Sequence, residues 1–99
     1  MDFSTLFKSK EIVRGEFKIT LKELSVQKMR AVEIEIKKDK HKGLALGLYY
    51  ASDELITEED YNAMPSSLQM ELLDAYNTLN VHEGVLEKIA KNSLGPTAL

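Results

Sequence analysis

The sequence predicts an α+β fold: a single, mostly helical domain in which a short N-terminal β-hairpin packs on about four helices. Three observations lead to this prediction. Apolar and polar residues alternate over residues 17–22, an apolar stripe with helical spacing runs over residues 68–79, and capping residues mark helix starts between them. One domain is expected from 99 residues, and 43% hydrophobic with 29% charged residues is ordinary for a globular chain.

The first elements expected are the two strands of the hairpin. Phe17, Ile19 and Leu21 alternate with polar residues, which is typical of a half-buried strand. Residues 12–13 supply a partner strand, and Gly15 breaks the chain between the two. Because a two-stranded hairpin is marginal by itself, it must pack on the helices.

A first helix is expected to begin after Ser25, whose hydroxyl suits an N-cap and whose neighbours fit a hydrophobic staple. The alternation over residues 32–36 leaves a strand as the alternative. The basic run Lys37–Lys42 is expected to end this element as a solvated loop. Gly43 then suits the left-handed conformation of a helix C-cap.

Three further helices are expected along the chain. Residues 44–51 are apolar all round, which indicates a buried helix or one that keeps an apolar face for a partner. Thr57 and Asp60 form a near capping box that opens a short acidic helix. Pro65 ends that helix and suits the first position of the next one. The next helix carries the clearest apolar stripe, which consists of Leu68, Leu72, Ala75, Tyr76 and Leu79.

The C-terminal part is expected to hold one more short helix around Val85, Leu86 and Ile89. Gly95 and Pro96 follow, and such residues favour a frayed terminus. We therefore expect one globular domain over residues 1–92 and a flexible tail over residues 93–99.

Composition and motifs argue against enzyme chemistry. The chain has no cysteine, which removes thiol nucleophiles and thiolate metal sites. Its two histidines, His41 and His82, have no second ligand at zinc spacing and are expected at the surface. No phosphate loop or nucleophile elbow occurs, and the acids Glu58–Asp60 have a simpler role at a helix N-terminus. We expect a protein that is not an enzyme and has no metal or cofactor.

The sequence also bears on the compartment. No apolar run approaches the length of about 18 residues that a membrane span needs. The N-terminus lacks the apolar region of a secretory signal, and the absence of cysteine fits a reducing compartment. We expect a cytoplasmic protein that makes no membrane contact.

Charge is divided unevenly along the chain. Residues 1–43 hold 11 Lys/Arg and 7 Asp/Glu, a net charge of +4, whereas residues 44–99 hold 2 and 9, a net charge of −7. Opposite halves of two copies can attract, which predicts weak self-association, although two solvated surfaces of different sign are the simpler interpretation. The run Lys37–Lys42 can meet phosphates, but Asp39 dilutes it and no aromatic residue interleaves, which disfavours nucleic-acid binding.

The apolar stretch over residues 44–51 is the candidate partner-binding segment. Leu46, Tyr49 and Tyr50 are the residues we expect to remain accessible, because tyrosine is large, stiff and amphipathic. A core helix is the alternative. Val85 and Leu86 are expected to take part in the same surface.

Several segments follow one another in a recognisable order. Glu16–Ser25 is a short strand followed by a Leu-Ser helix entry, and Leu44–Tyr50 is an apolar middle segment. Leu55–Tyr61, the following Met-Pro and the helix after it form an acidic turn, a proline and a closing helix. In this order the segments resemble the tail assembly chaperones of long-tailed bacteriophages, and the resemblance covers residues 15–82. Residues 51–54 lack the glycine-containing turn that the family commonly has there.

The resemblance implies a function and its partners. Such chaperones act in the host cell cytoplasm, bind the long tape measure protein, promote assembly of tail tube subunits around it and are absent from the finished virion. Many have a longer form, made by programmed frameshift, whose extension recruits tube subunits. Ala90-Lys91-Asn92 can be encoded with the slippery heptamer A-AAA-AAC. The alternatives are a structural tail-completion or connector protein and a small regulatory nucleic-acid-binding protein that uses Lys37–Lys42.

Overall fold

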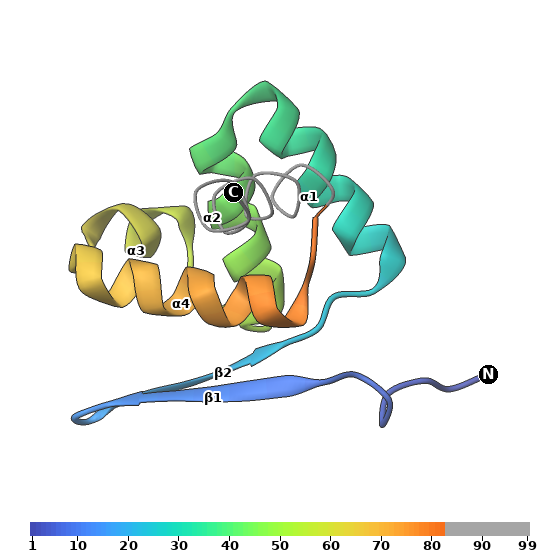
Figure 1. Cartoon of the computed structure of the whole chain (residues 1–99), viewed down its shortest axis with the longest axis horizontal. Coiled ribbons are helices and arrows are strands. Elements are labelled where there is room, and N and C mark those ends of the chain that lie inside the picture. Colours follow the sequence, from blue (N-terminus) through green and yellow to red (C-terminus); the bar gives the residue numbers. More distant parts are fainter. Residues whose placement is uncertain (83–99) are drawn as a thin grey trace, which may run out of the picture.

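The computed structural model describes residues 1–82, which form two strands followed by four helices (Figure 1). The elements are β1 (Ser9–Arg14), β2 (Phe17–Lys22), α1 (Val26–Lys38), α2 (Lys40–Ala51), α3 (Glu58–Ala63) and α4 (Ser66–Leu79). The hairpin lies beside α4, and α2 packs against α1, α3 and α4. The predicted α+β class is confirmed. Val85, Leu86 and the predicted boundary at residue 92 lie outside the described residues.

The hairpin is antiparallel, with Ile12 opposite Ile19 across the two strands. Its two-residue turn begins at Gly15, which has a φ of +62°. Glycine populates that left-handed region without steric cost, and a glycine first in a two-residue turn is typical of a type II′ hairpin. Ile19 and Leu21 are buried, whereas Phe17 on the same face is 38% exposed because it stands beside the turn.

The segment 25–38 is a helix, not the alternative strand. The Ser25 hydroxyl accepts a hydrogen bond from the Lys28 N–H, as the N-cap prediction requires. One residue, Asp39, separates α1 from α2, and its carboxylate accepts from the N–H groups of His41 and Lys42. The expected solvated loop at Lys37–Lys42 was therefore wrong: the lysines stand at two helix ends, because Asp39 caps a new helix at once.

The connection between α3 and α4 follows the capping signals closely. The Thr57 hydroxyl accepts from the Asp60 N–H, and the Asp60 carboxylate accepts from the Thr57 N–H, both at 3.1 Å. The capping box with aspartate in place of glutamate is thus complete. Pro65 is the N-cap of α4 and not its first residue, because its ψ of 142° continues the extended backbone of Met64.

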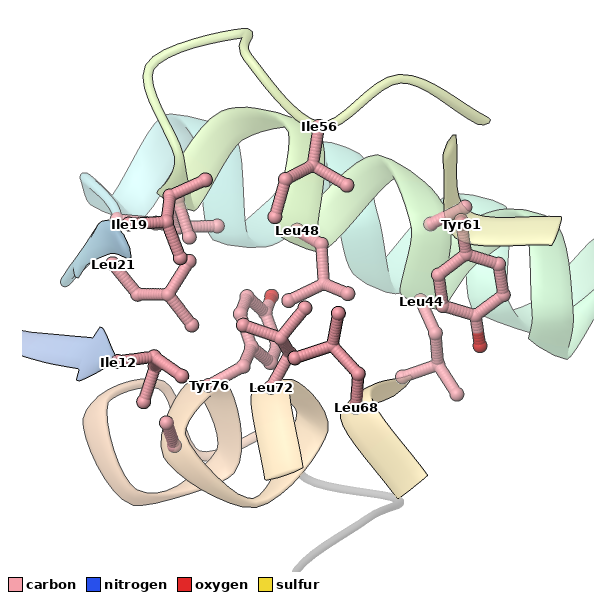
Figure 2. Close-up of a cluster of buried hydrophobic side chains, with 14 of the residues drawn as sticks. Ile12, Ile19, Leu21, Leu44, Leu48, Ile56, Tyr61, Leu68, Leu72 and Tyr76 are labelled. Atoms are coloured by element: carbon pink, nitrogen blue, oxygen red, sulfur yellow. The ribbon is translucent and has the colours of Figure 1, made fainter. Parts of the chain in front are cut away.

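The core lies where the hairpin, α2 and α4 meet (Figure 2). Leu21, Leu48, Leu72 and Tyr76 are fully buried there, and Leu68 is 8% exposed. Leu79 packs half-buried against the same cluster. The predicted stripe of α4 is therefore the face that enters the core. None of the helices within residues 1–82 combines the length and the apolar character that crossing a bilayer requires.

Leu72 tests this core directly. We expect Leu72→Ala to lower the free energy of unfolding by about 2–5 kcal/mol, because truncation leaves a cavity among fully buried side chains. The matched control is Met70→Ala on the same helix, since Met70 is 65% exposed and its truncation creates no cavity. Chemical denaturation followed by circular dichroism measures both, and equal effects of the two variants would contradict the assignment.

Candidate functional site

A groove with a volume of about 380 Å³ opens between α2, the end of α1 and the start of α3. Apolar side chains of α2 form one side, and two carboxylates and one ammonium group stand at its rim. We call this hollow the α2 groove. Its lining residues are Glu35, Lys42, Ala45, Leu46, Tyr49, Thr57 and Glu58. The structure thus brings together two of the residues predicted to bind a partner, Leu46 and Tyr49.

The groove exists because α2 is apolar all round. One side of the helix is in the core, where Leu44 and Leu48 are buried, while Leu46 and Tyr49 on another side are half-buried. A helix with this composition has more apolar surface than a domain of this size covers. Both interpretations of the stretch therefore apply, because it is a core helix that also keeps an apolar face accessible.

Two glycines let α2 approach its neighbours closely. A Cβ atom on Gly43 would lie 2.6 Å from the Cα of Ile36 in α1. A Cβ atom on Gly47 would lie 2.7 Å from the Cζ and Oη atoms of Tyr76 in α4. The expected C-cap role of Gly43 was therefore wrong. This glycine lies inside α2, and its missing side chain is what permits the contact with the α1 backbone.

The Tyr49 ring is held in place by Glu54, which lies in the turn that follows α2. Its hydroxyl donates a 2.8 Å hydrogen bond to the Glu54 carboxylate, and this bond raises the pKa of Tyr49 above its ordinary value. The ring of Tyr50 packs tilted against it, with centroids 5.9 Å apart. Tyr50 itself points to a different hollow, where Lys28 Nζ lies 5.5 Å from its ring centroid. Tyr50 is therefore not part of the α2 groove.

The turn after α2 has unusual backbone geometry. Asp53 and Glu54 have φ angles of +55° and +69°, in the left-handed region that costs a non-glycine residue roughly 1–2 kcal/mol. The turn is stabilised by Lys22, whose Nζ lies 2.8 Å from the Asp53 carboxylate, and by Ser52, whose hydroxyl accepts from the Ile56 N–H. This is the segment in which the resembled family carries a glycine-containing turn.

The basic run forms an exposed corner at the α1–α2 junction. Lys37 and Lys38 end α1, and Lys40, His41 and Lys42 begin α2. We call these residues the basic corner. Lys42 is shared with the α2 groove, so the corner places positive charge at one end of the apolar hollow.

The sequence did not predict three buried polar residues. Asn80 and His82 have partners that are distant in the chain, whereas Ser52 forms hydrogen bonds within its own turn. The Asn80 side chain accepts from the Leu24 N–H at 2.6 Å and donates to the Lys22 carbonyl at 3.4 Å. Ser52 is 1% exposed. A helix-ending asparagine and a serine after an apolar run were the available signals, but both residue types are equally common at exposed caps.

His82 is the third, and its predicted surface position was wrong. It is 1% exposed: Nε2 is hydrogen-bonded to the Tyr76 hydroxyl, and Nδ1 lies 3.3 Å from a Glu33 carboxylate oxygen. The ring stacks on Tyr76, and burial raises the pKa of that phenol far above its ordinary value, so the phenol stays protonated. Both ring nitrogens have partners, and the group links the end of α4 to α1.

The buried polar groups and the α2 groove differ in accessibility. Within residues 1–82 no group of three or more His, Asp or Glu side chains is placed to hold a metal ion. The Glu33–His82–Tyr76 group is buried and fully partnered, which leaves no ring nitrogen accessible to a substrate. The α2 groove, in contrast, is open and combines apolar side chains with a mixed-charge rim.

Comparison with known proteins gives no match: no family model, no curated protein and no solved structure is similar to the chain.

The strained turn beside Tyr49 generates a stability prediction. Glu54→Gly is expected to raise the free energy of unfolding by about 0.5–1 kcal/mol, because glycine adopts positive φ without the steric cost and the lost bond to Tyr49 is solvent-exposed. The control is Leu55→Gly. That residue is exposed and has negative φ, so glycine there should destabilise by about the same amount. Thermal unfolding measures the stability of both variants. A loss of stability in Glu54→Gly would contradict the inference that the backbone of Glu54 is strained.

Proposed function

We propose that this protein is a tail assembly chaperone of a long-tailed bacteriophage that binds the tape measure protein and promotes assembly of the tail tube around it. The α2 groove is the observation that carries the proposal. Leu46 and Tyr49 line one open hollow there while the opposite side of the same helix is in the core. A rigid helix with a surplus apolar face is suited to binding another polypeptide.

The groove favours an amphipathic helix as the bound segment. Its volume of about 380 Å³ accommodates a few large side chains and not a whole second helix. Helix-in-groove binding uses such anchors, spaced at i, i+3 and i+4 along one helix face. The rim carries Lys42 together with Glu35 and Glu58, so polar residues flanking the anchors find both signs of charge. A long, helix-rich tape measure protein offers many segments of this kind.

The rest of the proposal follows the resemblance. The protein acts in the host cell cytoplasm and leaves before the virion is complete, and a longer frameshifted form recruits tail tube subunits. Weak self-association belongs to the same proposal. The basic N-terminal half, with a net charge of +4, and the acidic C-terminal half, with a net charge of −7, attract each other between copies, which lets several copies line up along one long partner.

Co-purification with the tape measure protein of the same phage tests the groove. Leu46→Glu is expected to weaken binding tenfold or more, because a carboxylate replaces an apolar contact at the centre of the groove. The matched control is Leu55→Glu, an equally drastic change at a leucine that is 70% exposed and lies outside the groove. Unfolding curves of both variants confirm that they fold. Equal binding by the two variants would exclude the α2 groove as the contact surface.

The location of the protein separates a chaperone from a structural connector. Immunoblots should detect it in infected-cell lysate and not in purified virions. A stoichiometric amount in the particle would contradict a chaperone role and favour a tail-completion protein.

A further inference from the structure

A second hollow lies on other elements, between β1 and α4, with a volume of about 650 Å³. From β1 it is lined by the four consecutive residues Lys10–Val13, and from α4 by Ser67, Met70, Glu71, Asp74 and Ala75. Successive side chains of a strand point to opposite faces, so four consecutive residues line one hollow when the strand presents its edge to it. One wall is therefore backbone, and the other is a helix.

The hydrogen-bonding register shows that this edge of β1 is unpaired. The Glu23 N–H donates to the Lys8 carbonyl at 2.8 Å, so these two residues form a hydrogen-bonded pair of the ladder. Hydrogen-bonded and non-hydrogen-bonded pairs alternate from there to the turn-flanking pair Arg14–Phe17. The backbone N–H and C=O groups of Ser9, Glu11 and Val13 therefore point away from β2. All three residues are exposed, and within residues 1–82 no hydrogen bond reaches these outward backbone groups.

The outer edge of β2 differs from that of β1. The Lys22 carbonyl there already accepts from the Asn80 side chain, and the Leu24 N–H beyond it donates to the same residue. The Lys22 ammonium group is also paired, with Asp53 at 2.8 Å. The end of β2 is therefore covered from within the domain, although the outward backbone groups of Lys18 and Thr20 have no hydrogen bond within residues 1–82. The edge of β1 differs because it borders a hollow whose other wall is α4.

The helix wall determines which strand would fit. Glu71 and Asp74 are both exposed, and within the described part of the chain neither takes part in an ion pair. Met70 is 65% exposed beside them. On the strand side, the Glu11 carboxylate is paired with Lys18 at 3.4 Å. Two unpaired carboxylates and one exposed apolar side chain thus face the open edge. Two basic residues of β1 stand nearby: Lys10 lines the same hollow, and the Arg14 guanidinium donates to the Ser67 hydroxyl at 2.7 Å.

We propose that an extended segment of a partner protein adds to β1 as a third strand and directs a Lys or Arg side chain at Glu71 and Asp74. The spacing fits. Met70 and Asp74 are one helical turn apart, about 6 Å along the axis, and alternate side chains of a strand repeat every 6.6 Å or so. β1 and α4 extend along roughly the same axis in Figure 1, with opposite chain directions. One residue of the segment can therefore contact Met70 while the residue two positions away meets the carboxylates.

A second copy of β1 is a poor occupant of this edge. Symmetric antiparallel pairing with full overlap sets Glu11 opposite Glu11, Lys10 opposite Lys10, or Lys10 opposite Arg14, depending on the register. Like charges directly opposite each other destabilise a sheet. These like charges disfavour a second copy, and the carboxylates of Glu71 and Asp74 favour a different segment whose basic residue lies opposite Ile12 and not opposite Lys10 or Arg14. The proposal is independent of the α2 groove, because the two hollows share no lining residue.

The probe is a blocked seven-residue peptide of alternating threonine and valine with one central lysine, added to the full-length protein and followed by NMR amide exchange. Saturating peptide should slow exchange of the Glu11 and Val13 amides roughly tenfold or more, since they become hydrogen-bonded. The Thr20 amide on the opposite edge is the internal control and should not change. The same peptide with glutamate in place of lysine should bind at least tenfold more weakly.

Variants separate the backbone from the charge contribution. Val13→Pro removes one edge N–H without touching the β1–β2 hydrogen bonds, because that group points outward, and should abolish protection of Glu11. Val13→Thr keeps the N–H and should bind like the wild type. The double variant Glu71→Gln with Asp74→Asn should weaken binding about tenfold while leaving the fold intact, and keeps the test decisive if Val13→Pro does not fold.

Three results would overturn the proposal. The first is no change at the β1 amides at saturating peptide, and the second is equal binding of the lysine and glutamate peptides. The third is concentration-dependent protection of the Glu11 and Val13 amides without any peptide, which would assign the edge to a second copy of this chain.

Discussion

The close approach of α2 to α1 and α4 is the constraint on which the remaining structure depends. Gly43 and Gly47 remove the two side chains that would hold α2 away from the Ile36 backbone and from the Tyr76 ring. With α2 that deep, Leu48 and Leu72 are fully buried and the hairpin packs over one continuous core. The same depth limits how far Leu46 and Tyr49 protrude, so they line a groove and do not form a flat patch.

Buried polar side chains then connect elements that the apolar core alone would leave loosely related. Asn80 joins the end of α4 to the segment between β2 and α1, and His82 joins it to Glu33 in α1. Buried hydrogen-bonding groups are costly unless satisfied, so such contacts specify one arrangement of the elements. They also bear on binding. Asn80 occupies the carbonyl of Lys22 at the end of β2, whereas β1 keeps the outward groups of Ser9, Glu11 and Val13 beside the hollow against α4.

The two hollows would recognise partners by different chemistry. The α2 groove offers apolar side chains of a helix, which suits the side chains of another helix. The hollow beside β1 offers unpaired backbone groups and two carboxylates, which suits an extended basic segment. Under the proposed chaperone function, two separate surfaces would allow the tape measure protein and a second partner to be held at once.

Local signals determined most of the secondary structure. The alternation of Ile19 and Leu21, the Ser25 cap, the Thr57 capping box and the stripe around Leu72 depend on neighbours within a few residues, so each was readable from the chain. The groove was readable in part, because an all-round apolar helix implies a surplus face. Tyr50 shows the limit, since adjacent tyrosines of one helix point into different hollows.

Tertiary structure alone decided the roles of Gly43, Asn80 and His82. Gly43 suited a helix cap until α2 was seen to continue through it against Ile36, and His82 suited the surface until Tyr76 and Glu33 were seen around it. The open edge of β1 is also decided by tertiary structure. It exists because β2 pairs with one side of β1 while α4 lies beside the other side. The physical reason is shared: each role depends on atoms that packing of separate elements brings into contact, and local periodicity and capping chemistry carry no information about them.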